Sequence, residues 1–564
     1  MSRHPLLRLF PLFRGSERLL GGALFGLMLA ALANLAGPWL VAHAIDVDMA
    51  SGDREGLVRT SLGYVGLLAV ALSATWVSRV GLEVVAQRAM LRLKRHLFQH
   101  LVDHDLAFHD RHPSGSLITR VQGDTEALRV LFAEVILMVP ADGVMFLGMF
   151  AVVAWTTPQM LPVVFAVVPV YGLLFLVFRK VGPPYFLAAR AVKARLTGFL
   201  AEHLRAMPIL QAFGREPWAR DRAETLNADV FRAEVMSSLQ PVWYFNTVVL
   251  SQRIAMVATL LIGGGMVAEG AITLGKLVMG IGYLRLMFRP LMRLSHQLST
   301  LERARAAAIR VADILDTEAQ IRTPEAPVPW PGLNDALRLE QVGFAYVKGT
   351  PVLNGMDLTF PRGSNTGIVG ATGAGKSTVL NLLFRFRDPT SGRVTVDGVD
   401  LRDLDLTELR RRIGLVQQDV HLFPGTVLDN LGGDAAPAQR ALDVVGLSLD
   451  LGLGLLDGGA NLSRGERQLL TFARALVADP EILVLDEATS AIDPETERTV
   501  QRALERLVQG RTTVTVAHRL ATVRDCDRIY VLAHGEVQEV GTHDELLALG
   551  GLYAALAQLQ GVAA

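Results

Sequence analysis

The chain has 564 residues, more than one ordinary domain accommodates, which indicates two or three domains. Its 55 Lys and Arg residues balance its 55 Asp and Glu residues, so no basic surplus points to nucleic acid as a partner. With 51% hydrophobic residues and a mean hydropathy of +0.33, the chain is unusually apolar for a soluble protein, and the excess lies before residue 300. The single cysteine, Cys526, excludes an internal disulfide and is expected to be a small buried residue.

The first apolar stretch begins at Leu19, after several arginines, and Ala31-Leu32-Ala33 is similar to a signal-peptidase site. The stretch continues to about Ile45, however, which is too long for the hydrophobic region of a signal peptide. We therefore expect an uncleaved first membrane span, preceded by an amphipathic segment, residues 2–16, on the cytoplasmic surface.

Six apolar segments are long enough to cross a bilayer, which requires about 20 residues. They lie at approximately 19–45, 58–85, 131–156, 158–180, 243–268 and 274–298. The connections alternate between short ones (46–57, 157 and 269–273) and long charged ones (about 86–130 and 181–242). The short loops are mainly acidic and the long loops are rich in Arg and Lys, so the positive-inside rule predicts that the long loops and both termini are cytoplasmic.

Both long loops have apolar residues at helical spacing and are expected to extend the membrane helices. Each contains a break at which a helix can turn: His112-Pro113-Ser114-Gly115 in the first, and Met207-Pro208 with Phe213-Gly214 in the second.

The charged residues inside the predicted spans include Asp142, Arg253 and Arg285. Charges at membrane depth are costly and usually face a cavity or a partner. One hypothesis is that they line or gate a substrate cavity. The alternative is that the helices extend past the bilayer and place Asp142 and Arg253 at its inner interface.

A Pro-rich connector at 323–331 precedes a phosphate-binding motif, Gly370-Ala371-Thr372-Gly373-Ala374-Gly375-Lys376-Ser377, that matches G-x-x-x-x-G-K-[ST] without a mismatch. Glycines permit the tight path on which the backbone N–H groups of Gly373, Ala374, Gly375 and Lys376 surround a phosphate. The Lys376 side chain adds a positive charge, the Ser377 hydroxyl can ligate Mg²⁺, and Thr378 can support the same phosphates.

The apolar run Ile482-Leu483-Val484-Leu485 is typical of a buried parallel strand and places Asp486 at its carboxyl end, beside the metal. Glu487 is then in position to act as the general base that polarises the attacking water. Leu462-Ser463-Arg464-Gly465-Glu466 begins a helix whose N-terminus presents N–H groups to a phosphate.

These motifs, in this order, resemble those of ATP-binding cassette (ABC) proteins. Phe108-His109-Asp110 through Val121 and Gly198-Phe199-Leu200 through Phe213 likewise resemble the two cytoplasmic loops of ABC exporters. The resemblance implies that each loop ends in a short coupling helix seated in a cassette, the second in the cassette of the partner subunit.

The resemblance also assigns site residues. Tyr346 is expected to stack on adenine, Gln418 to link the metal to a coupling helix, and His518 to contact the γ-phosphate. Ser463 and Gly465 would contact ATP held by the partner cassette, and Asp493 would lie on the loop that crosses the same interface. Gln417 is a second candidate for the role of Gln418.

Two features depart from the family pattern, which is Leu-Ser-Gly-Gly-Gln at the signature. This chain has Arg464 and Glu466 at the third and fifth positions, and Glu466 adds negative charge. The stretch from Gln418 to Ser463 is also short and lacks the Thr-x-x-Gly-Glu-x-Gly pattern that normally contacts the coupling helices.

The sequence thus predicts a membrane all-α six-helix exporter domain at 1–320, a linker at 321–334 and an α/β P-loop ABC cassette at 335–564. The expected function is ATP-driven export of a small hydrophobic or amphipathic molecule across the bacterial cytoplasmic membrane, with ATP and Mg²⁺ as cofactors. The resemblance is strongest to multidrug-type half transporters, which imply a second half transporter in a homodimer or heterodimer. Export of a lipid, peptide or thiol and an ATP-gated channel or regulator are the alternatives, while the apolar spans argue against a soluble ABC ATPase.

Overall fold

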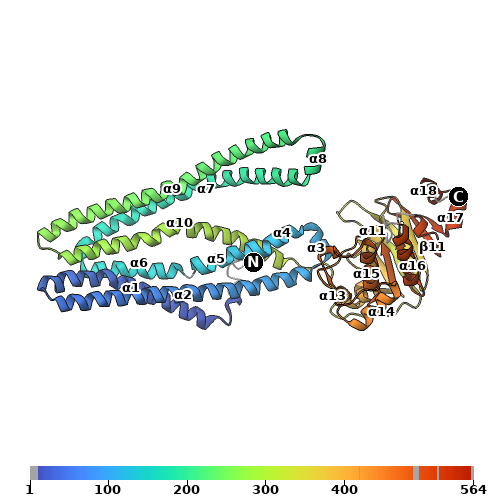
Figure 1. Cartoon of the computed structure of the whole chain (residues 1–564), viewed down its shortest axis with the longest axis horizontal. Coiled ribbons are helices and arrows are strands. Elements are labelled where there is room, and N and C mark those ends of the chain that lie inside the picture. The colour runs from blue at the N-terminus through green and yellow to red at the C-terminus, as the bar shows by residue number, and fades with distance from the viewer. Residues whose placement is uncertain (1–10, 137, 418, 487–493, 518–519, 561–564) are drawn as a thin grey trace. The chain divides into compact units, whose positions relative to one another are not determined.

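The computed structural model describes residues 11–136, 138–417, 419–486, 494–517 and 520–560. These residues form two compact units (Figure 1). Unit 1 comprises residues 1–102 and 114–317, whereas unit 2 comprises residues 103–113 and 318–564. Unit 1 is helical and unit 2 contains β-sheets covered by helices, as the sequence predicts. Residues 2–10 of the predicted amphipathic segment lie outside the described residues.

Long helices build unit 1, and short helical turns connect them. The helices are α1 (Glu17–His43), α2 (Arg54–Val102), α4 (Ser114–Thr119), α5 (Thr125–Val130), α6 (Met138–Thr156), α7 (Leu161–Arg205), α8 (Met207–Ala212), α9 (Glu216–Ala268) and α10 (Leu274–Asp316). α2 has 49 residues and α9 has 53, so at 1.5 Å per residue each is roughly 75–80 Å long. This is more than twice the hydrocarbon thickness of a bilayer, so these helices extend well into the aqueous phase, as predicted for the long loops.

Five segments of the described chain are long and apolar enough to span a membrane. They are Glu17–Met49, Arg54–Val102, Ser114–Thr156, Pro169–Arg205 and Glu216–Ala268. The sixth predicted span, 274–298, lies in α10, which is less apolar because it carries Lys276, Arg285, Arg289 and Arg293. Its place in the bilayer remains a prediction.

Small residues allow the helices of unit 1 to approach closely. A Cβ atom on Gly26 would lie 2.2 Å from the Ser78 Oγ, and one on Gly282 would lie 3.0 Å from the Pro38 Cβ. These contacts join α1 to α2 and to α10, and they are typical of helix pairs in membranes. At the other end of α1, Asp46 accepts hydrogen bonds from the Thr273 hydroxyl and, at 2.7 Å, from the Gly275 N–H at the start of α10.

Ion pairs join the segments of unit 1 that derive from the first long loop. Arg129 of α5 contacts Glu83 of α2 at 2.6 Å and Glu126 at 2.7 Å. Arg310 of α10 binds both carboxylate oxygens of Asp124, which is 8% exposed. Forked contacts of this kind hold two helices in one orientation more strictly than a single hydrogen bond does.

The sheets of unit 2 separate into one four-stranded sheet of order β2-β1-β4-β5, one six-stranded sheet of order β12-β11-β3-β10-β9-β6, and the pair β7-β8. The strands are β1 (Ala336–Phe344), β2 (Leu353–Pro361), β3 (Asn365–Gly370), β4 (Ser391–Val396), β5 (Val399–Asp400), β6 (Ile413–Val416), β7 (Gly425–Thr426), β8 (Gly454–Leu455), β9 (Ile482–Asp486), β10 (Thr512–Val516), β11 (Arg528–Ala533) and β12 (Glu536–Gly541). Strands β11, β3, β10, β9 and β6 are parallel, so their carboxyl ends meet at one edge.

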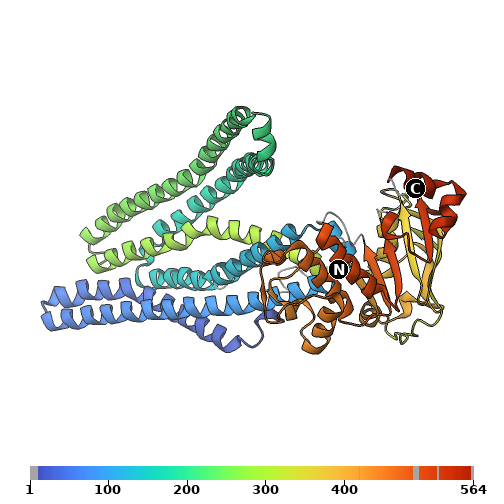
Figure 2. The same cartoon turned by 45° about the vertical axis from the view of Figure 1, so that its right-hand side comes forward.

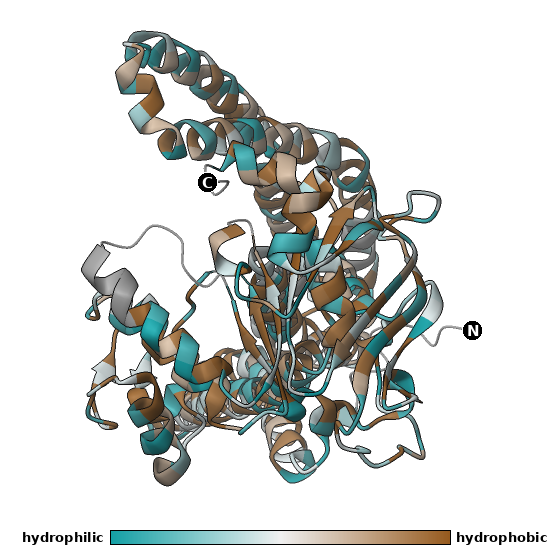
Figure 3. Ribbon diagram, turned by 90° about the vertical axis from the view of Figure 1, so that its right-hand side faces the viewer, coloured by the Kyte–Doolittle hydropathy of each residue, from teal (hydrophilic) through white to brown (hydrophobic). Residues whose placement is uncertain are grey.

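Helices of unit 2 pack against these sheets and against one another. They are α3 (Leu106–Arg111), α11 (Lys376–Leu383), α12 (Leu406–Arg412), α13 (Val427–Asn430), α14 (Ala435–Val445), α15 (Arg464–Leu476), α16 (Pro494–Val508), α17 (His543–Leu549) and α18 (Leu552–Leu559). Apolar residues, brown in Figure 3, fill the layers between these helices and the strands, with one core around β1, β2 and α11 and another around α14 and α15. Cys526 lies in a further core and is 6% exposed, as expected.

Candidate ATP site

The phosphate-binding loop connects the carboxyl end of β3 to the first turn of α11. Gly373 and Gly375 have φ values of 85° and 104°, a region that residues with a Cβ rarely adopt. A Cβ on Gly375 would also lie 2.5 Å from the Leu353 Cδ2. The glycines of the motif are therefore required by the backbone path, and the loop directs the N-terminus of α11 towards the site of a phosphate.

Lys376 is the buried charge of this loop, with an exposed fraction of 5%. Its Nζ donates hydrogen bonds to the carbonyl oxygens of Gly370, at 2.7 Å, and Ala371, at 3.1 Å. The ammonium group is thus held within the loop, where a phosphate can take the place of the carbonyl partners. Ser377 is exposed and Thr378 is buried, so the Ser377 hydroxyl is the accessible one of the two.

Tyr346 stands beside the same helix. Its hydroxyl lies 3.2 Å from the Thr378 Oγ1 and accepts a hydrogen bond from the Asn381 Nδ2, also at 3.2 Å. The ring is 44% exposed, so a flat ligand can reach it. The structure therefore brings this predicted adenine-binding residue to the phosphate-binding loop.

Asp486 ends β9 at the edge of the sheet from which the phosphate-binding loop arises. The register pairs Asp486 with Val516 of β10, and Val516 with Ile368 of β3, two residues before Gly370. Asp486 is half-buried, and Ser377 and Asp486 supply the hydroxyl and carboxylate oxygens that Mg²⁺ prefers. Gln418, Glu487, Asp493 and His518 lie outside the described residues; Gln418, Glu487 and His518 follow β6, β9 and β10, whose carboxyl ends meet at this edge.

The signature residues begin α15, where Ser463 is the N-cap. The Ser463 hydroxyl accepts a hydrogen bond from the Glu466 N–H at 3.2 Å, and the Glu466 carboxylate accepts one from the Ser463 N–H at 2.8 Å. Hydrogen bonds from the side chain and backbone of Ser463 lower the pKa of Glu466, so this group is a carboxylate at neutral pH. Gly465 is buried, whereas Ser463 remains exposed. The unusual Glu466 therefore completes a capping box that stabilises the start of the helix.

The short segment before the signature is held by its own hydrogen bonds. The Asn461 side-chain oxygen Oδ1 accepts a hydrogen bond from the Leu456 N–H at 3.0 Å, and the Asn461 Nδ2 donates to the Gly454 carbonyl oxygen at the same distance. On the N-terminal side of this segment, the Asn430 side chain accepts a hydrogen bond from Arg474 of α15 at 2.7 Å. The segment is thus ordered without the pattern that is usual in related cassettes.

The first predicted coupling helix is α3, and it belongs to the same compact unit as the cassette. Asp105 caps α3 by accepting from the Phe108 N–H at 2.9 Å, and its other oxygen accepts from the Gln320 N–H at 2.5 Å. Burial alone would raise the pKa of Asp105, but backbone N–H donors of Gln320, Phe108 and Ile321 hold it below the usual value. Phe108 is 5% exposed, with the His104 ring stacked on it at 4.2 Å.

Asp110, on the same short helix, forms an ion pair with Arg387, which follows α11. The Arg387 guanidinium carbon lies 4.8 Å from the centroid of the Tyr346 ring. Sequence reasoning missed this contact, because nothing in the local pattern around Arg387 distinguishes it from a surface arginine.

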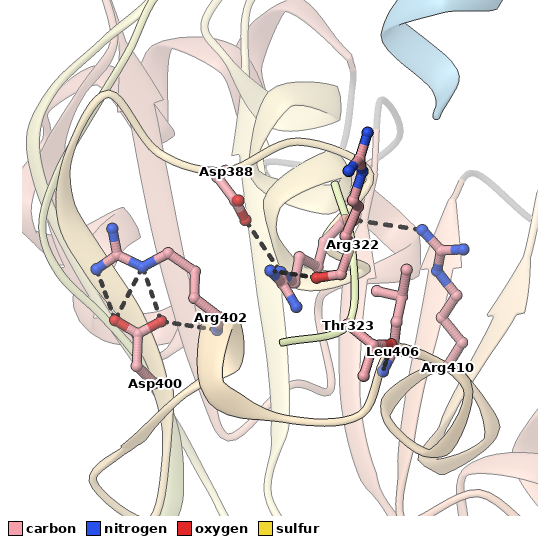
Figure 4. A network of polar contacts seen from close by, with 8 residues as sticks. Arg322, Thr323, Asp388, Asp400, Arg402, Leu406 and Arg410 are labelled. Carbon is pink, nitrogen blue, oxygen red and sulfur yellow. Dashed lines mark hydrogen bonds and ion pairs between the residues drawn. The ribbon is translucent and has the colours of Figure 1, made fainter. Parts of the chain in front are cut away.

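The chain that leads into the cassette is fixed by a network of arginines (Figure 4). Arg385 donates to the Arg322 carbonyl at 3.1 Å and pairs with Asp388 at 3.1 Å. The Thr323 hydroxyl accepts from the Leu406 N–H at 3.2 Å (Figure 4). The part of the predicted linker that carries these contacts is therefore held against the cassette.

The second predicted coupling helix is α8, which joins α7 to α9 where these two helices end side by side (Figures 1 and 2). It starts at Met207-Pro208 and ends before Gly214, at the breaks that the sequence predicts. No residue of α8 is buried within the described chain. Apolar residues on this turn are accessible to solvent, with Ile209 62% and Phe213 76% exposed.

The three charges predicted within membrane spans lie in different environments. Arg253 and Arg285 are exposed, whereas Asp142 is half-buried. Their place relative to a substrate cavity remains a prediction.

Comparison with known proteins agrees with this architecture. Residues 20–291 match the ABC transporter transmembrane region, and residues 353–490 match the ABC transporter family. The chain is 35% identical over 524 residues, 90% of this chain and 77% of the relative, to a probable multidrug resistance ABC transporter ATP-binding/permease protein of Bacillus subtilis (strain 168). It is 34% identical over 518 residues, 89% of this chain and 81% of the relative, to a fatty acid ABC transporter ATP-binding/permease protein of Mycobacterium bovis.

Among solved structures, a bacterial Atm1-family ABC exporter with ATP bound matches with a TM-score of 0.80 and 26% sequence identity. The match covers 97% of this chain and 98% of that one. The fold and site define a multi-pass membrane transporter driven by an ATP-hydrolysing cassette. The chain belongs to the ABC transporter family, in its exporter fold, and is a half transporter that binds ATP and couples its hydrolysis to transport.

Proposed function

We propose that this chain exports a small hydrophobic or amphipathic molecule across the bacterial cytoplasmic membrane, with both termini in the cytoplasm. The observation that supports this most directly is the match over 90% of the chain to a transporter whose name specifies multidrug resistance. An apolar hollow of about 580 Å³ in unit 1 is consistent with such a substrate; its lining includes Leu35, Trp39, Trp155 and Tyr283.

In the proposed mechanism, Tyr346 stacks on adenine and the phosphate-binding loop holds the β- and γ-phosphates. Bound Mg²⁺ would be held by Ser377, Asp486 and Gln418 and would neutralise charge on the phosphate oxygens. Glu487 accepts a proton from the attacking water, and His518 contacts the γ-phosphate. Lys376 is already desolvated within the loop, so it loses little hydration when a phosphate replaces its carbonyl partners.

The working form is a dimer of half transporters, because the signature residues Ser463 and Gly465 would contact ATP held by a partner cassette. The loop at Asp493 would cross the same interface. The exposed apolar face of α8 supports the same arrangement, since it would be covered by the partner's cassette. ATP closes the two cassettes, the coupling helices transmit the movement to the membrane helices, and hydrolysis resets the cycle.

Lipid export is the second candidate, and the fatty acid transporter among the relatives favours it. One measurement distinguishes drug export from lipid export. We would reconstitute the chain alone in lipid nanodiscs and compare the stimulation of ATP hydrolysis by cationic amphipathic drugs with that by long-chain fatty acids. Stimulation by drugs alone supports drug export, whereas stimulation by fatty acids alone contradicts it and supports lipid export.

The same preparation tests the motor. Lys376→Ala should lose ATP binding, and Glu487→Gln should bind ATP but lower turnover by about 10²-fold or more, because it lacks the general base. Turnover in the unmodified chain would indicate a homodimer, whereas ATP binding without turnover would indicate that a different half transporter is required. Rapid hydrolysis by Glu487→Gln would contradict the assignment of the base. Substrate flux down its gradient without turnover would favour a channel.

Arg285, Arg253 and Asp142 are proposed to line or gate a substrate cavity, although none of the three is among the residues that line the apolar hollow described above. Each Ala variant would be assayed for transport of whichever substrate stimulates hydrolysis. Transport at the unmodified rate in all three variants would remove this part of the proposal.

A further inference from the structure

Arg387 connects two parts of the cassette unit that serve different purposes. Its Nη2 donates to the Asp110 carboxylate on α3, and its guanidinium carbon lies 4.8 Å from the Tyr346 ring centroid. The Arg387 side chain is only 14% exposed, although it carries a full charge. A charge so removed from water requires partners, and the carboxylate and the electron-rich ring face are those that the structure provides.

The Tyr346 ring is also held through its hydroxyl group. Its hydroxyl contacts Thr378 and Asn381, both at 3.2 Å and both on α11, the helix that follows the phosphate-binding loop. Contacts therefore run without interruption from Asp110 on α3 through Arg387 and Tyr346 to the helix that would hold the phosphates. Because the ring is still 44% exposed, adenine can reach it while these contacts persist.

We propose that Arg387 is a positioning residue that couples the binding of adenine at Tyr346 to the docking of α3 on the cassette. The proposal rests on the proposed function, in which Tyr346 is the adenine-stacking residue. When α3 is docked, Asp110 fixes the guanidinium plane and Arg387 fixes the ring, so less side-chain freedom is lost when adenine stacks. By linkage, bound adenine must strengthen the docking of α3 to the same degree.

The test is equilibrium binding to the full-length chain in nanodiscs, with two probes: a non-hydrolysable ATP analogue and inorganic tripolyphosphate, which has no base. We expect Asp110→Asn to weaken the ATP analogue on the order of three- to tenfold and to leave tripolyphosphate unchanged. Arg387→Ala should weaken the ATP analogue at least as much. The double variant, which combines Asp110→Asn with Arg387→Ala, should bind the analogue no more weakly than Arg387→Ala alone. Additive effects, or equal effects on both probes, would overturn the proposal.

Two further variants exclude a general disturbance of the cassette. Arg387→Lys retains a positive charge that can pair with Asp110 but lacks the planar guanidinium group. In this background, unlike in Arg387→Ala, the further change Asp110→Asn should still weaken binding of the ATP analogue to some degree. Arg393→Ala removes an arginine whose partner, Glu340, lies on β1, and it should leave binding of both probes unchanged. A loss of affinity in Arg393→Ala equal to that in Arg387→Ala would contradict a specific role for Arg387.

Failure of the proposed function would look different. Lys376→Ala should abolish binding of both probes, and Tyr346→Ala should weaken only the ATP analogue. If Tyr346→Ala leaves the ATP analogue unaffected, Tyr346 is not the adenine-binding residue and the proposed site is wrong. If Tyr346→Ala behaves as expected while Asp110→Asn has no effect, only the coupling through Arg387 is wrong.

Discussion

The two predicted coupling helices, α3 and α8, have the same length and opposite surroundings. Each has six residues. Helix α3 buries Ala107 and Phe108 and belongs to the cassette unit, whereas α8 buries no residue within the described chain. Within the described residues, α3 is therefore packed in its own unit, whereas nothing in unit 1 buries α8. The exposed apolar residues Ile209 and Phe213 support the proposal that a partner cassette covers α8 in a dimer of half transporters.

The largest expected effect is on stability and concerns Phe108, a buried residue of α3. Phe108→Ala should lower the free energy of unfolding of the cassette unit by about 3 kcal/mol, because it removes a buried side chain and leaves a cavity beside the His104 ring. Thermal unfolding of the purified protein measures this, with Ile209→Ala on α8 as the matched control. Since Ile209 is 62% exposed, the control should change stability by less than about 0.5 kcal/mol. Equal losses in both variants would break the contrast between the two helices.

A charge on the exposed helix should affect transport and leave stability unchanged. Ile209→Asp places a carboxylate on the apolar face of α8, which requires desolvation of that charge if a partner cassette covers it. We expect substrate transport to fall about tenfold or more, with an unchanged melting temperature. Glu202→Asp, a charge-conserving change at the end of α7, is the control. Full transport activity in Ile209→Asp would mean that α8 does not dock.

The smallest expected effect is at the N-cap of α3. Asp105→Ala removes the acceptor for the Phe108 N–H and should cost about 1 kcal/mol, whereas Asp105→Asn should retain most of the cap. The folded structure holds the pKa of Asp105 below that of an unfolded aspartate, so its contribution is present above the unfolded pKa and is lost as the pH falls through the lower folded value. Melting temperatures measured from pH 7 to pH 3 should therefore converge between the parent and Asp105→Ala only at the acidic end.

Local motifs account for most of what the sequence predicted correctly. The phosphate-binding loop follows from eight consecutive residues, and the helix breaks at Pro113 and Pro208 follow from proline chemistry. By contrast, Arg387 and Asp110 are 277 residues apart, so no periodicity or motif could pair them. The role of Glu466 as a capping carboxylate was also missed, although the Ser-x-x-Glu spacing was present in the sequence.

The spans were harder to predict than the cassette. The extents of the apolar segments placed the break between the third and fourth predicted spans correctly, since the turn at Thr157-Pro158 separates α6 from α7 as expected. The predicted span 274–298 in α10 is the exception, because its four basic residues give it a composition between that of a membrane span and that of a cytoplasmic helix. Length alone cannot separate these two possibilities, since helices of this fold continue far beyond the bilayer.

The solitary cysteine has a practical consequence. Burial raises the pKa of the Cys526 thiol to about 12, so at neutral pH it is protonated and shielded from maleimide and methanethiosulfonate reagents. A cysteine introduced at an exposed position such as Phe213 would therefore carry a spin label or fluorophore alone, without removal of the native residue. If the chain forms a homodimer, two such labels, one on each copy, would report how far apart the α8 turns lie as nucleotide is added.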